Sequence, residues 1–372
     1  MNAKWFRCPP DEWLRHILEI HFHPDQGARY WIDRAREKGI VISRDIKTVD
    51  DMIAFGPMDE NALASRPVED FIPQCFHGEK KHFILGDTAG TTGNPKVTAF
   101  RDDEFYQIFV DFFGYVAESL SFPKQINWLW VGPSGPHIIG KAARMLPPRM
   151  DSMDAFAVDF DPRWIKKLSP GSLGWERYFQ HIEDQALRIL NTQEISILFS
   201  TPPVIERLAQ KMGADLRRRI KGVHYGGLAL EPALYKRLQA ELFPEAVHIS
   251  GYGNTLFGVC LEVEPQEKGN LHYFSPGARL IIRLVRPGDN GPETSAQAKR
   301  LGQTVSYAER GQVVFSRLDE SFLILNMFER DTAVRIPPSA KALKLGLHLD
   351  GFADPRPLTD INQGRKTSLG LY

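Results

Sequence analysis

The sequence has little cysteine, no excess of either charge and no long apolar run. Its three cysteines, Cys8, Cys75 and Cys260, are far apart and include no Cys-x-x-Cys pair. This spacing argues against a disulfide scaffold and against a thiolate zinc site. The low cysteine content fits a protein of the reducing cytoplasm.

Charge and hydropathy argue against two further classes of protein. Lys and Arg together number 46, as do Asp and Glu, so no overall basic field exists to attract nucleic acid or an acidic membrane. No apolar run approaches the roughly 18 residues of a membrane span, and the N-terminus lacks the apolar core of a signal peptide. We therefore expect no nucleic-acid partner and no membrane insertion, and any anion site must be local.

Apolar residues alternate between strand-like runs and helical stripes. In a chain of 372 residues, 42% of them hydrophobic, this pattern can bury a large core in two domains or one multilayered domain. Strand-like runs occur at 83–85, 128–131, 196–199 and 222–225. Helical patterns cover 11–38, 103–120, 175–191, 204–212 and 232–242. Strands separated by such helices predict βαβ units and a largely parallel sheet, so the fold class is α/β.

After residue 271 the pattern changes. The β-rich runs at 279–285 and 312–316 follow one another without helices of comparable length between them. They predict a smaller antiparallel, β-rich subdomain next to the parallel sheet.

Three polar residues that suggest chemistry have ordinary explanations. His21 and His23 are two positions apart, a spacing that favours surface or packing roles over a shared metal. Ser134 follows a predicted strand, but Pro136 occupies the last position of a Gly-x-Ser-x-Gly hydrolase motif. A hydrolase is therefore the less favoured interpretation.

The stretch from Thr88 to Lys96 follows a predicted strand and is rich in glycine and hydroxyl groups. Gly90 and Gly93 permit the positive φ angles and the close backbone approach by which amide groups form a concave anion site. Pro95 stiffens the exit of the loop, and Lys96 adds a mobile positive charge. The stretch therefore predicts a phosphate-binding loop.

This loop is not a Walker P-loop, because Pro95 precedes Lys96 and Val97 follows it where that motif needs glycine and a hydroxyl residue. It resembles the phosphate loop of the adenylate-forming superfamily, which includes acyl-CoA synthetases, luciferases and peptide-synthetase adenylation domains. Their pattern is Thr-Ser-Gly-Thr-Thr-Gly-x-Pro-Lys-Gly, from which Ala89 and Val97 depart. The resemblance implies that the β- and γ-phosphates of ATP are surrounded by Thr88, Gly90, Thr91, Thr92, Gly93 and Lys96.

Three later segments resemble the superfamily in the expected order. They contain Gly226, Gly227, Tyr252, Gly253, Asn254, Thr255 and Asp331. In relatives a Gly-Gly turn flanks adenine, the tyrosine of Tyr-Gly-x-Thr-Glu lies against the adenine ring, and its threonine approaches the α-phosphate. The aspartate binds both ribose hydroxyls. Each of these residues, taken singly, has a structural explanation. The tyrosine could simply pack in the core, the threonine could cap a helix and the aspartate could belong to an exposed ion pair.

A histidine and a missing glutamate complete the comparison. His137, in a Pro-His-x-x-Gly setting, resembles the histidine that borders the acyl pocket, although a core histidine is nearly as good an explanation. Leu256 replaces the glutamate that helps relatives to hold Mg²⁺. The resemblance thus implies ATP and Mg²⁺ as cofactors but leaves the metal ligands unknown.

The end of the chain departs from the family pattern. Residues 351–354 resemble the hinge Gly-Arg-x-Asp, with Phe352 in place of arginine, and only 18 residues follow. An ordinary domain needs at least about 50 residues. We therefore expect a truncated C-terminal domain, in which Lys366 is the one lysine available to replace the lysine that this domain supplies in relatives.

The resemblance and the patterns together predict one large N-terminal adenylation domain, with mainly parallel sheets flanked by helices. Its expected parts are an N-terminal helical arm (1–80), a nucleotide-binding α/β region (81–265), a β-rich subdomain (266–350), and a hinge with a vestigial C-terminal segment (351–372).

The implied activity is ATP-dependent activation of a carboxylic acid to an acyl-adenylate, with release of pyrophosphate. The N-terminal layout and the Thr-Pro-Pro turn at 201–203 most resemble the phenylacetate–CoA ligase branch. An aromatic content of 11% favours an aromatic or otherwise apolar acid, such as a phenazine or phenylacetate-like carboxylate. A downstream reductase or acyl-acceptor protein and a homodimer are expected partners. The alternatives are a fatty-acyl protein ligase and a nucleotide-binding scaffold without turnover.

Overall fold

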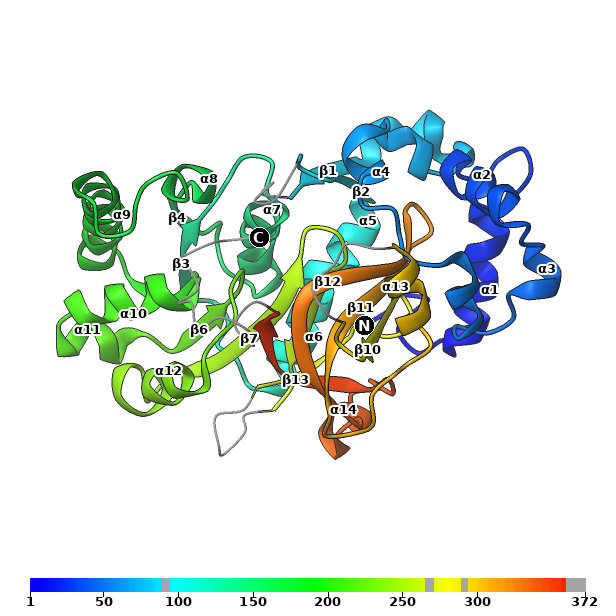
Figure 1. Cartoon of the computed structure of the whole chain (residues 1–372). Helices are drawn as coiled ribbons and strands as arrows, with labels where there is room; N and C mark the ends of the chain where they lie inside the picture. Colours follow the sequence, from blue (N-terminus) through cyan, green and yellow to red (C-terminus); the bar gives the residue numbers. More distant parts are fainter. Residues whose placement is uncertain (89–93, 265–270, 289–293, 359–372) are drawn as a thin grey trace. The chain divides into compact units, whose positions relative to one another are not determined.

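The computed structural model describes residues 1–88, 94–264, 271–288 and 294–358 (Figure 1). The chain divides into two compact units. Unit 1 holds the described residues of 1–86, 90–105 and 274–364, and unit 2 holds those of 87–89 and 106–273. Across the described ranges, every helix is too short or too polar to cross a bilayer.

Unit 2 is built on a sheet with parallel strands in the order β4-β3-β5-β6-β7. These strands are β3 (Asn127–Gly132), β4 (Phe156–Asp159), β5 (Ile195–Ser200), β6 (Gly222–Tyr225) and β7 (Val247–Asn254). The next strand, β8 (Gly258–Glu262), pairs antiparallel with the end of β7, and β9 (His272–Phe274) follows. The predicted strands at 128–131, 196–199 and 222–225 are confirmed.

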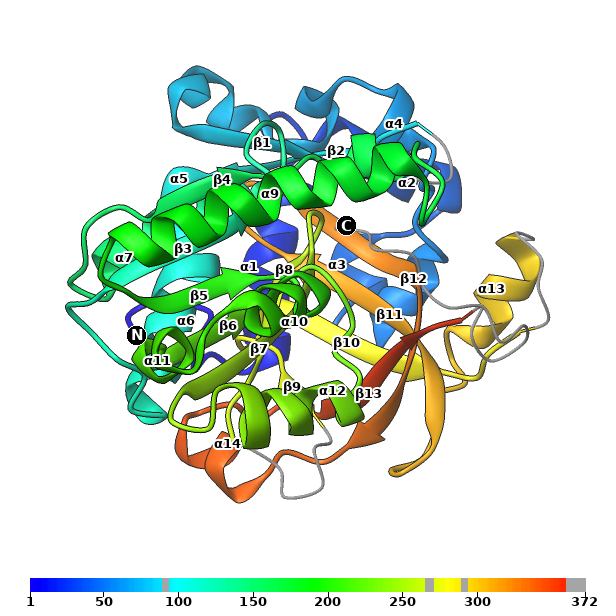
Figure 2. The same cartoon turned by 90° about the vertical axis from the view of Figure 1, so that its left-hand side faces the viewer.

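Helices cover both faces of the unit 2 sheet (Figure 2). One face carries α9 (Leu173–Thr192), α10 (Pro202–Lys211), α11 (Ala214–Arg219), and α12 (Pro232–Arg237) with its π-helical extension η5 (Leu238–Leu242). The other carries the π-helical segment η4 (Tyr106–Asp111), α6 (Phe112–Ser119) and α7 (Ile138–Arg149). The short helix α8 (Pro162–Ile165) follows β4. This βαβ order confirms the predicted α/β class.

Unit 1 contains an antiparallel sheet in the order β10-β11-β12-β13. Its strands are β10 (Leu280–Val285), β11 (Arg310–Leu318), β12 (Leu323–Ile336) and β13 (Gly351–Pro357). A two-stranded sheet pairs β1 (Phe83–Asp87) with β2 (Val97–Arg101). The predicted β-rich character of this part of the chain is confirmed.

Short helices make up most of the remainder of unit 1. The α-helices are α1 (Pro10–His21), α2 (Arg29–Lys38), α3 (Ile42–Asp45), α4 (Ala62–Ser65), α5 (Asp102–Phe105), α13 (Thr294–Arg300) and α14 (Ala340–Lys344). The 3-10 helices are η1 (Asp51–Phe55), η2 (Val68–Phe71) and η3 (Gln74–His82). Two indole groups attach α1 and α2 to the sheet, because Trp13 Nε1 donates to the Leu318 carbonyl at 2.8 Å and Trp31 Nε1 to the Leu323 carbonyl at 2.9 Å.

The single helix predicted over 11–38 is wrong, because the chain forms two helices there. Pro24 and Gly27 lie between them, and a Cβ atom on Gly27 would sit only 2.5 Å from the His21 carbonyl oxygen. His23 Nδ1 accepts hydrogen bonds from the two backbone N–H groups after Pro24, at 3.2 and 3.1 Å. A proline and a side-chain-fixed turn therefore override the helical spacing of the apolar residues.

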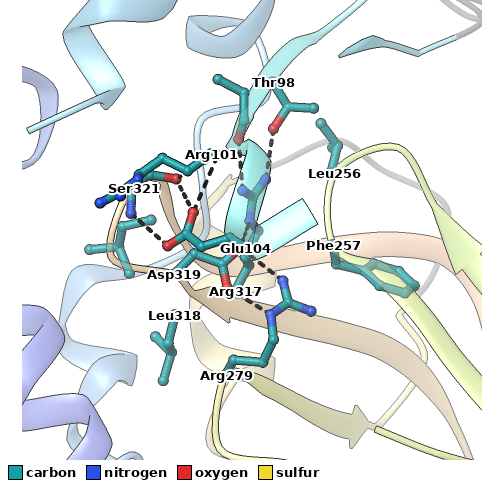
Figure 3. Close-up of polar contacts among 12 residues, drawn as sticks. Thr98, Arg101, Glu104, Leu256, Phe257, Arg279, Arg317, Leu318, Asp319 and Ser321 are labelled. Atoms are coloured by element: carbon teal, nitrogen blue, oxygen red, sulfur yellow. Dashed lines mark hydrogen bonds and ion pairs between the residues drawn. The ribbon is translucent and has the colours of Figure 1, made fainter. Parts of the chain in front are cut away.

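A buried ionic cluster anchors β2 to the unit 1 sheet (Figure 3). Asp319 accepts hydrogen bonds from Arg279, at 2.7 Å to Nε and 3.0 Å to Nη2, and also from Arg317. Arg317 donates in addition to Thr98 Oγ1 at 2.8 Å and to the Ala99 carbonyl at 2.7 Å. Buried charges are tolerated only with such partners. The cluster therefore fixes the strand that follows the predicted phosphate loop.

Glu104 lies beside this cluster, and among the described residues no Lys or Arg side chain forms an ion pair with it (Figure 3). Its carboxyl group accepts hydrogen bonds from the Ser321 backbone N–H, at 3.1 Å, and from the Ser321 hydroxyl. Burial, together with the negative charge of Asp319, raises the pKa of Glu104 to about 7.

Candidate functional site

Unit 2 contains a cavity at the carboxyl ends of its parallel strands. Its empty volume is about 640 Å³, counting the space open to solvent at its mouth. The apolar side chains that line it are Phe109, Phe113, Ile138, Ile139, Ala142, Leu146, Phe199, Val259 and Leu261. In open α/β sheets, ligands bind beyond the carboxyl ends of the strands, and apolar walls with few polar groups are typical of sites for small molecules.

The helix predicted over 103–120 supplies part of this wall. Phe109 belongs to the π-helical segment η4, and Phe113 belongs to α6. Both side chains are buried, as the predicted core stripe requires, and both also face the cavity. Single π-helical turns occur often at functional sites.

Five residues that the sequence assigns to the nucleotide site lie on the cavity wall. They are Gly226, Gly227, Gly253, Asn254 and Thr255. Gly227 has a φ angle of +81°, which favours glycine. A Cβ atom on Gly253 would lie 2.2 Å from a backbone carbonyl oxygen of β8. The fold thus needs glycine at both positions to bring the backbone to the cavity; their contacts with nucleotide remain predictions.

Asn254 shapes the turn between β7 and β8. Its Oδ1 accepts hydrogen bonds from the backbone N–H groups of Leu256 at 2.9 Å and Phe257 at 3.1 Å. This is an Asx-type turn, and it places Thr255 against the cavity. The side-chain oxygen of Asn254 is therefore committed to the hairpin.

The described residues of this region offer no group of side chains that could hold a metal ion. Leu256, which stands where relatives have glutamate, is buried, with 3% of its surface exposed. Among the residues that the structure describes, no three His, Cys, Asp or Glu side chains are grouped to hold a metal ion. Mg²⁺ would take its ligands from phosphate oxygens and water, and it remains a prediction.

Tyr252 is half-buried and does not line the cavity. Successive side chains on a strand point to opposite faces, so Gly251 and Gly253 face the cavity and Tyr252 faces away from it. The tyrosine ring centroid lies 5.9 Å from that of Tyr273 and 6.0 Å from that of Phe257. The role of Tyr252 as an adenine platform remains a prediction.

The entry to the predicted phosphate loop is held within unit 2. Arg163 Nη2 donates to Asp87 Oδ1 at 2.6 Å and to the Thr88 carbonyl at 3.3 Å. The Asp87 backbone N–H donates to the Pro136 carbonyl at 3.4 Å. The loop residues Gly90, Thr91, Thr92 and Gly93, with Ala89, lie outside the described residues.

Two predicted site residues belong to unit 1. Lys96 Nζ lies 2.6 Å from the Glu60 carboxylate, and the lysine side chain is 22% exposed. Asp331 lies in β12 opposite Pro357 and is 9% exposed. The contacts of both residues described here are with other residues of unit 1. Their proposed contacts with ATP remain predictions.

His137 precedes the first residue of α7 and is buried. Burial, followed by the Arg163 cation, lowers its pKa, while the carboxylate of Asp87 opposes that shift. Its Nδ1 has no hydrogen-bond partner within the part of the chain that the structure describes. The next residue, Ile138, lines the cavity, so His137 borders the wall without forming it.

The sequence marks His224 only as part of a predicted strand, but the structure places it in the cavity wall. It is two residues before Gly226 and therefore on the same face of the chain. That spacing is the signal that could have identified it. Its neighbours Phe113 and Phe199 belong to other elements. The sequence does not show that these elements lie next to the strand of His224.

Behind the cavity, a buried polar network holds the ends of β6 and β7. The Tyr225 hydroxyl lies 2.7 Å from His248 Nδ1, and His248 Nε2 lies 3.1 Å from the Phe243 carbonyl. A carbonyl only accepts, so Nε2 carries the proton and the Tyr225 hydroxyl donates to Nδ1. Tyr235 donates to Glu262 Oε2 at 2.8 Å. Burial raises the pKa of Glu262 from 4.5 to about 8.

The raised pKa of Glu262 predicts a pH-dependent stability. The folded state holds this proton more tightly than the unfolded state, so the stability contributed by the protonated group is lost as pH rises from about 4.5 to about 8. Glu262→Gln cannot ionise. Its melting temperature relative to the wild type is therefore expected to be several degrees higher at pH 8.5 than at pH 5.

Thermal unfolding of both proteins across this pH range tests the prediction. Glu245→Gln is the matched control, because Glu245 is exposed and Lys221 lowers its pKa, so that it titrates below this window. A constant difference in melting temperature between Glu262→Gln and the wild type would contradict the raised pKa.

Comparisons with known proteins bear on the fold. No protein-family profile and no curated protein matches the sequence. A structure of 2-hydroxyisobutyryl-CoA ligase, in the postadenylation state in complex with R3-HIB-AMP, matches with a TM-score of 0.66 at 12% identity, over 93% of this chain and 65% of that one. A second structure of that ligase, with 2-HIB-AMP and CoA in the thioesterification state, matches with a TM-score of 0.62 at 14% identity, over the same shares.

The fold is therefore that of the adenylate-forming ligases. The solved protein named above, 2-hydroxyisobutyryl-CoA ligase, is one that this chain resembles in fold, and the chain spans 65% of its length.

Proposed function

We propose that the protein activates a carboxylic acid with ATP, forming an acyl-adenylate and releasing pyrophosphate. The supporting observation is the unit 2 cavity, in which apolar walls meet the backbone turns at Gly226, Gly227 and 253–255. Apolar walls suit the body of an organic acid, and glycine turns allow a nucleotide to approach the backbone closely. The fold that this chain shares with an acyl-CoA ligase supports acid activation as the use of this pairing.

The reaction requires no protein nucleophile. An oxygen of the acid carboxylate attacks the α-phosphorus of ATP, a new oxygen–phosphorus bond forms, and the bond to the leaving pyrophosphate breaks. Catalysis then depends on positioning and on stabilising the charge that develops on the phosphate oxygens. Mg²⁺, when bound with ATP, neutralises part of that charge.

Each proposed residue has one role in this step. Lys96 and the loop from Thr88 to Gly93 hold the β- and γ-phosphates, and Thr255 approaches the α-phosphate. Gly227 and Tyr252 flank adenine, and Asp331 holds the ribose hydroxyls. His137 borders the acid.

The acid is proposed to be aromatic. Phe109, Phe113 and Phe199 line the cavity, and aromatic rings favour offset or edge contacts with other rings. A phenylacetate-like or phenazine carboxylate has this character. The motif order also resembles that of a short adenylase of phenazine antibiotic biosynthesis in the griseoluteate pathway, which would place the reaction in secondary metabolism.

ATP–pyrophosphate exchange with a panel of aromatic acids tests the proposal. At least one acid is expected to support exchange at saturating Mg²⁺. Binding of ATP without exchange for any acid would favour the alternative of a nucleotide-binding scaffold. Preference for long-chain acids would favour a fatty-acyl protein ligase.

The fate of the adenylate is a separate prediction. A reductase or an acyl-acceptor protein is expected to take the acyl group, and the protein is expected to form a homodimer. No acyl acceptor is needed for exchange, because exchange involves only the first step and its reversal. The assay therefore tests acid activation by itself.

A further inference from the structure

His224 supplies an imidazole ring to a cavity whose other side walls are mostly apolar. Its ring centroid lies 4.2 Å from that of Phe199 and 4.7 Å from that of Phe113, and the residue is 5% exposed. It lines the cavity from the end of β6. The ring is therefore held between two aromatic side chains with one part facing the empty volume.

The hydrogen bond of His224 to the backbone fixes its tautomer. Nδ1 lies 3.0 Å from the Ile249 carbonyl oxygen, which can only accept, so Nδ1 carries the proton. Burial lowers the pKa of His224 to about 4, so the imidazole is neutral at pH 7. A neutral imidazole has a single N–H group, and Nε2 therefore presents a lone pair and accepts hydrogen bonds.

No described residue uses that lone pair. Nε2 of His224 has no hydrogen-bond partner within the described part of the chain, and it is not among the fully enclosed side-chain atoms that lack one. Two other polar groups of the wall are committed elsewhere, since the Tyr225 hydroxyl donates to His248 and Asn254 Oδ1 accepts from the hairpin. Nε2 is thus an acceptor that faces the cavity.

An acceptor in such surroundings favours a ligand that brings a donor. When an apolar ligand displaces water from an enclosed polar group without replacing its hydrogen bond, the group loses the stabilisation that water gave it. A ligand with a hydroxyl or amino group at the matching position restores that hydrogen bond. The site then disfavours the ligand without a donor, because that ligand leaves the buried acceptor unpaired.

We propose that His224 Nε2 accepts a hydrogen bond from a hydroxyl or amino group on the body of the acid, so that the substrates are apolar acids that carry a hydrogen-bond donor away from the carboxylate. This inference rests on the proposed acid activation for the identity of the ligand. It makes His224 a residue that determines specificity, because its contact is with the substrate body and not with the reacting carboxylate.

Calorimetry with matched pairs of acids tests the inference in the wild-type protein. The pairs are 3- and 4-hydroxybenzoic acid and 4-aminobenzoic acid against benzoic acid, and 3- and 4-hydroxyphenylacetic acid against phenylacetic acid, each in the presence of α,β-methylene-ATP. At least one donor-bearing acid is expected to bind about 10-fold or more tightly than its partner, the effect of one buried hydrogen bond. Absence of such a preference in every pair, absence of binding included, overturns the inference.

Substitution of His224 separates a specificity role from a structural one. His224→Phe keeps a ring in the wall and removes the acceptor, so the affinity ratio of the preferred pair is expected to fall to about one. A purely structural role would weaken both acids equally and leave the ratio unchanged. His181→Phe is the matched control, because His181 is exposed on α9 and bonds to Gln185, and its ratio is expected to match the wild type.

A spectroscopic readout follows His224 in the wild-type protein. In wild-type protein with ¹⁵N-labelled histidine, the Nε2 resonance of His224 is expected to shift when the preferred acid binds, and to shift less with its donor-free partner. Equal shifts for both acids would overturn the inference. Assignment uses the same spectra of His181→Phe and His224→Phe.

Pyrophosphate exchange distinguishes failure of the inference from failure of the proposed function. Exchange without donor preference would retain acid activation and overturn the role of His224. Donor preference in binding without exchange for any acid would retain the role of His224 and overturn acid activation.

Discussion

Lys96→Ala is expected to lower the rate of ATP–pyrophosphate exchange about 10²- to 10³-fold, the effect of removing one charge-stabilising donor. The protein is expected to remain folded, since Lys96 is partly exposed and its ion pair with Glu60 contributes at most about 1 kcal/mol. In the ATP complex the ammonium group would exchange the Glu60 carboxylate for phosphate oxygens. Exchange kinetics measure the first effect, and thermal unfolding measures the second.

Lys80→Ala is the control for this experiment. Lys80 also belongs to unit 1 and forms an ion pair, with Glu69 at 3.3 Å, but its side chain is 72% exposed and it is not in the phosphate-loop motif. Its exchange rate is expected to stay within about twofold of the wild type, as for most surface substitutions. An unchanged rate in Lys96→Ala would remove Lys96 from the site.

Asp331→Ala is expected to raise KM for ATP about 10- to 100-fold, the cost of losing hydrogen bonds to a charged acceptor. KM for the acid is expected to change much less, because the proposed contact is with ribose alone. The position of Asp331 in the middle of β12, with 9% of its surface exposed, keeps its orientation fixed by the sheet. Initial rates over a range of each substrate measure the two constants separately.

Modified nucleotides sharpen this prediction. Wild-type protein is expected to discriminate against 2′-deoxy-ATP and 3′-deoxy-ATP, and Asp331→Ala is expected to lose that discrimination. Asp350→Ala is the matched control, since it removes a unit 1 carboxylate that Arg335 binds at 2.8 and 2.6 Å. Equal increases of both KM values in Asp331→Ala would contradict a ribose contact.

Elements with a strong local signal could be predicted from the sequence. The strand at 222–225 occurs with the predicted bounds, and the helix predicted at 175–191 occurs as Leu173–Thr192. Apolar periodicity suffices in such cases, because a buried face dictates the spacing in either element. The helix predicted over 11–38 fails because a local turn after His23 competes with the periodic signal.

The candidate site is only partly predictable for a different reason. The glycines at 227 and 253 stand out in the sequence because few other residues permit a positive φ angle or so close a backbone approach. His224 does not stand out, since its role depends on Phe113 and Phe199, which are 111 and 25 positions away in the chain. Likewise, the sequence cannot tell which face of β7 lines the cavity, so the outward position of Tyr252 becomes visible only in the fold.

The sequence by itself determined the α/β class, the order of the strands along the chain and the backbone turns that need glycine, because these follow from periodicity and allowed φ angles. Only the tertiary structure decided which strands are neighbours, which side chains share the cavity and which polar groups have lost water there. Those properties depend on contacts between residues far apart in the chain. The raised pKa of Glu262 and the His224 lone pair that no described residue uses are consequences of that packing.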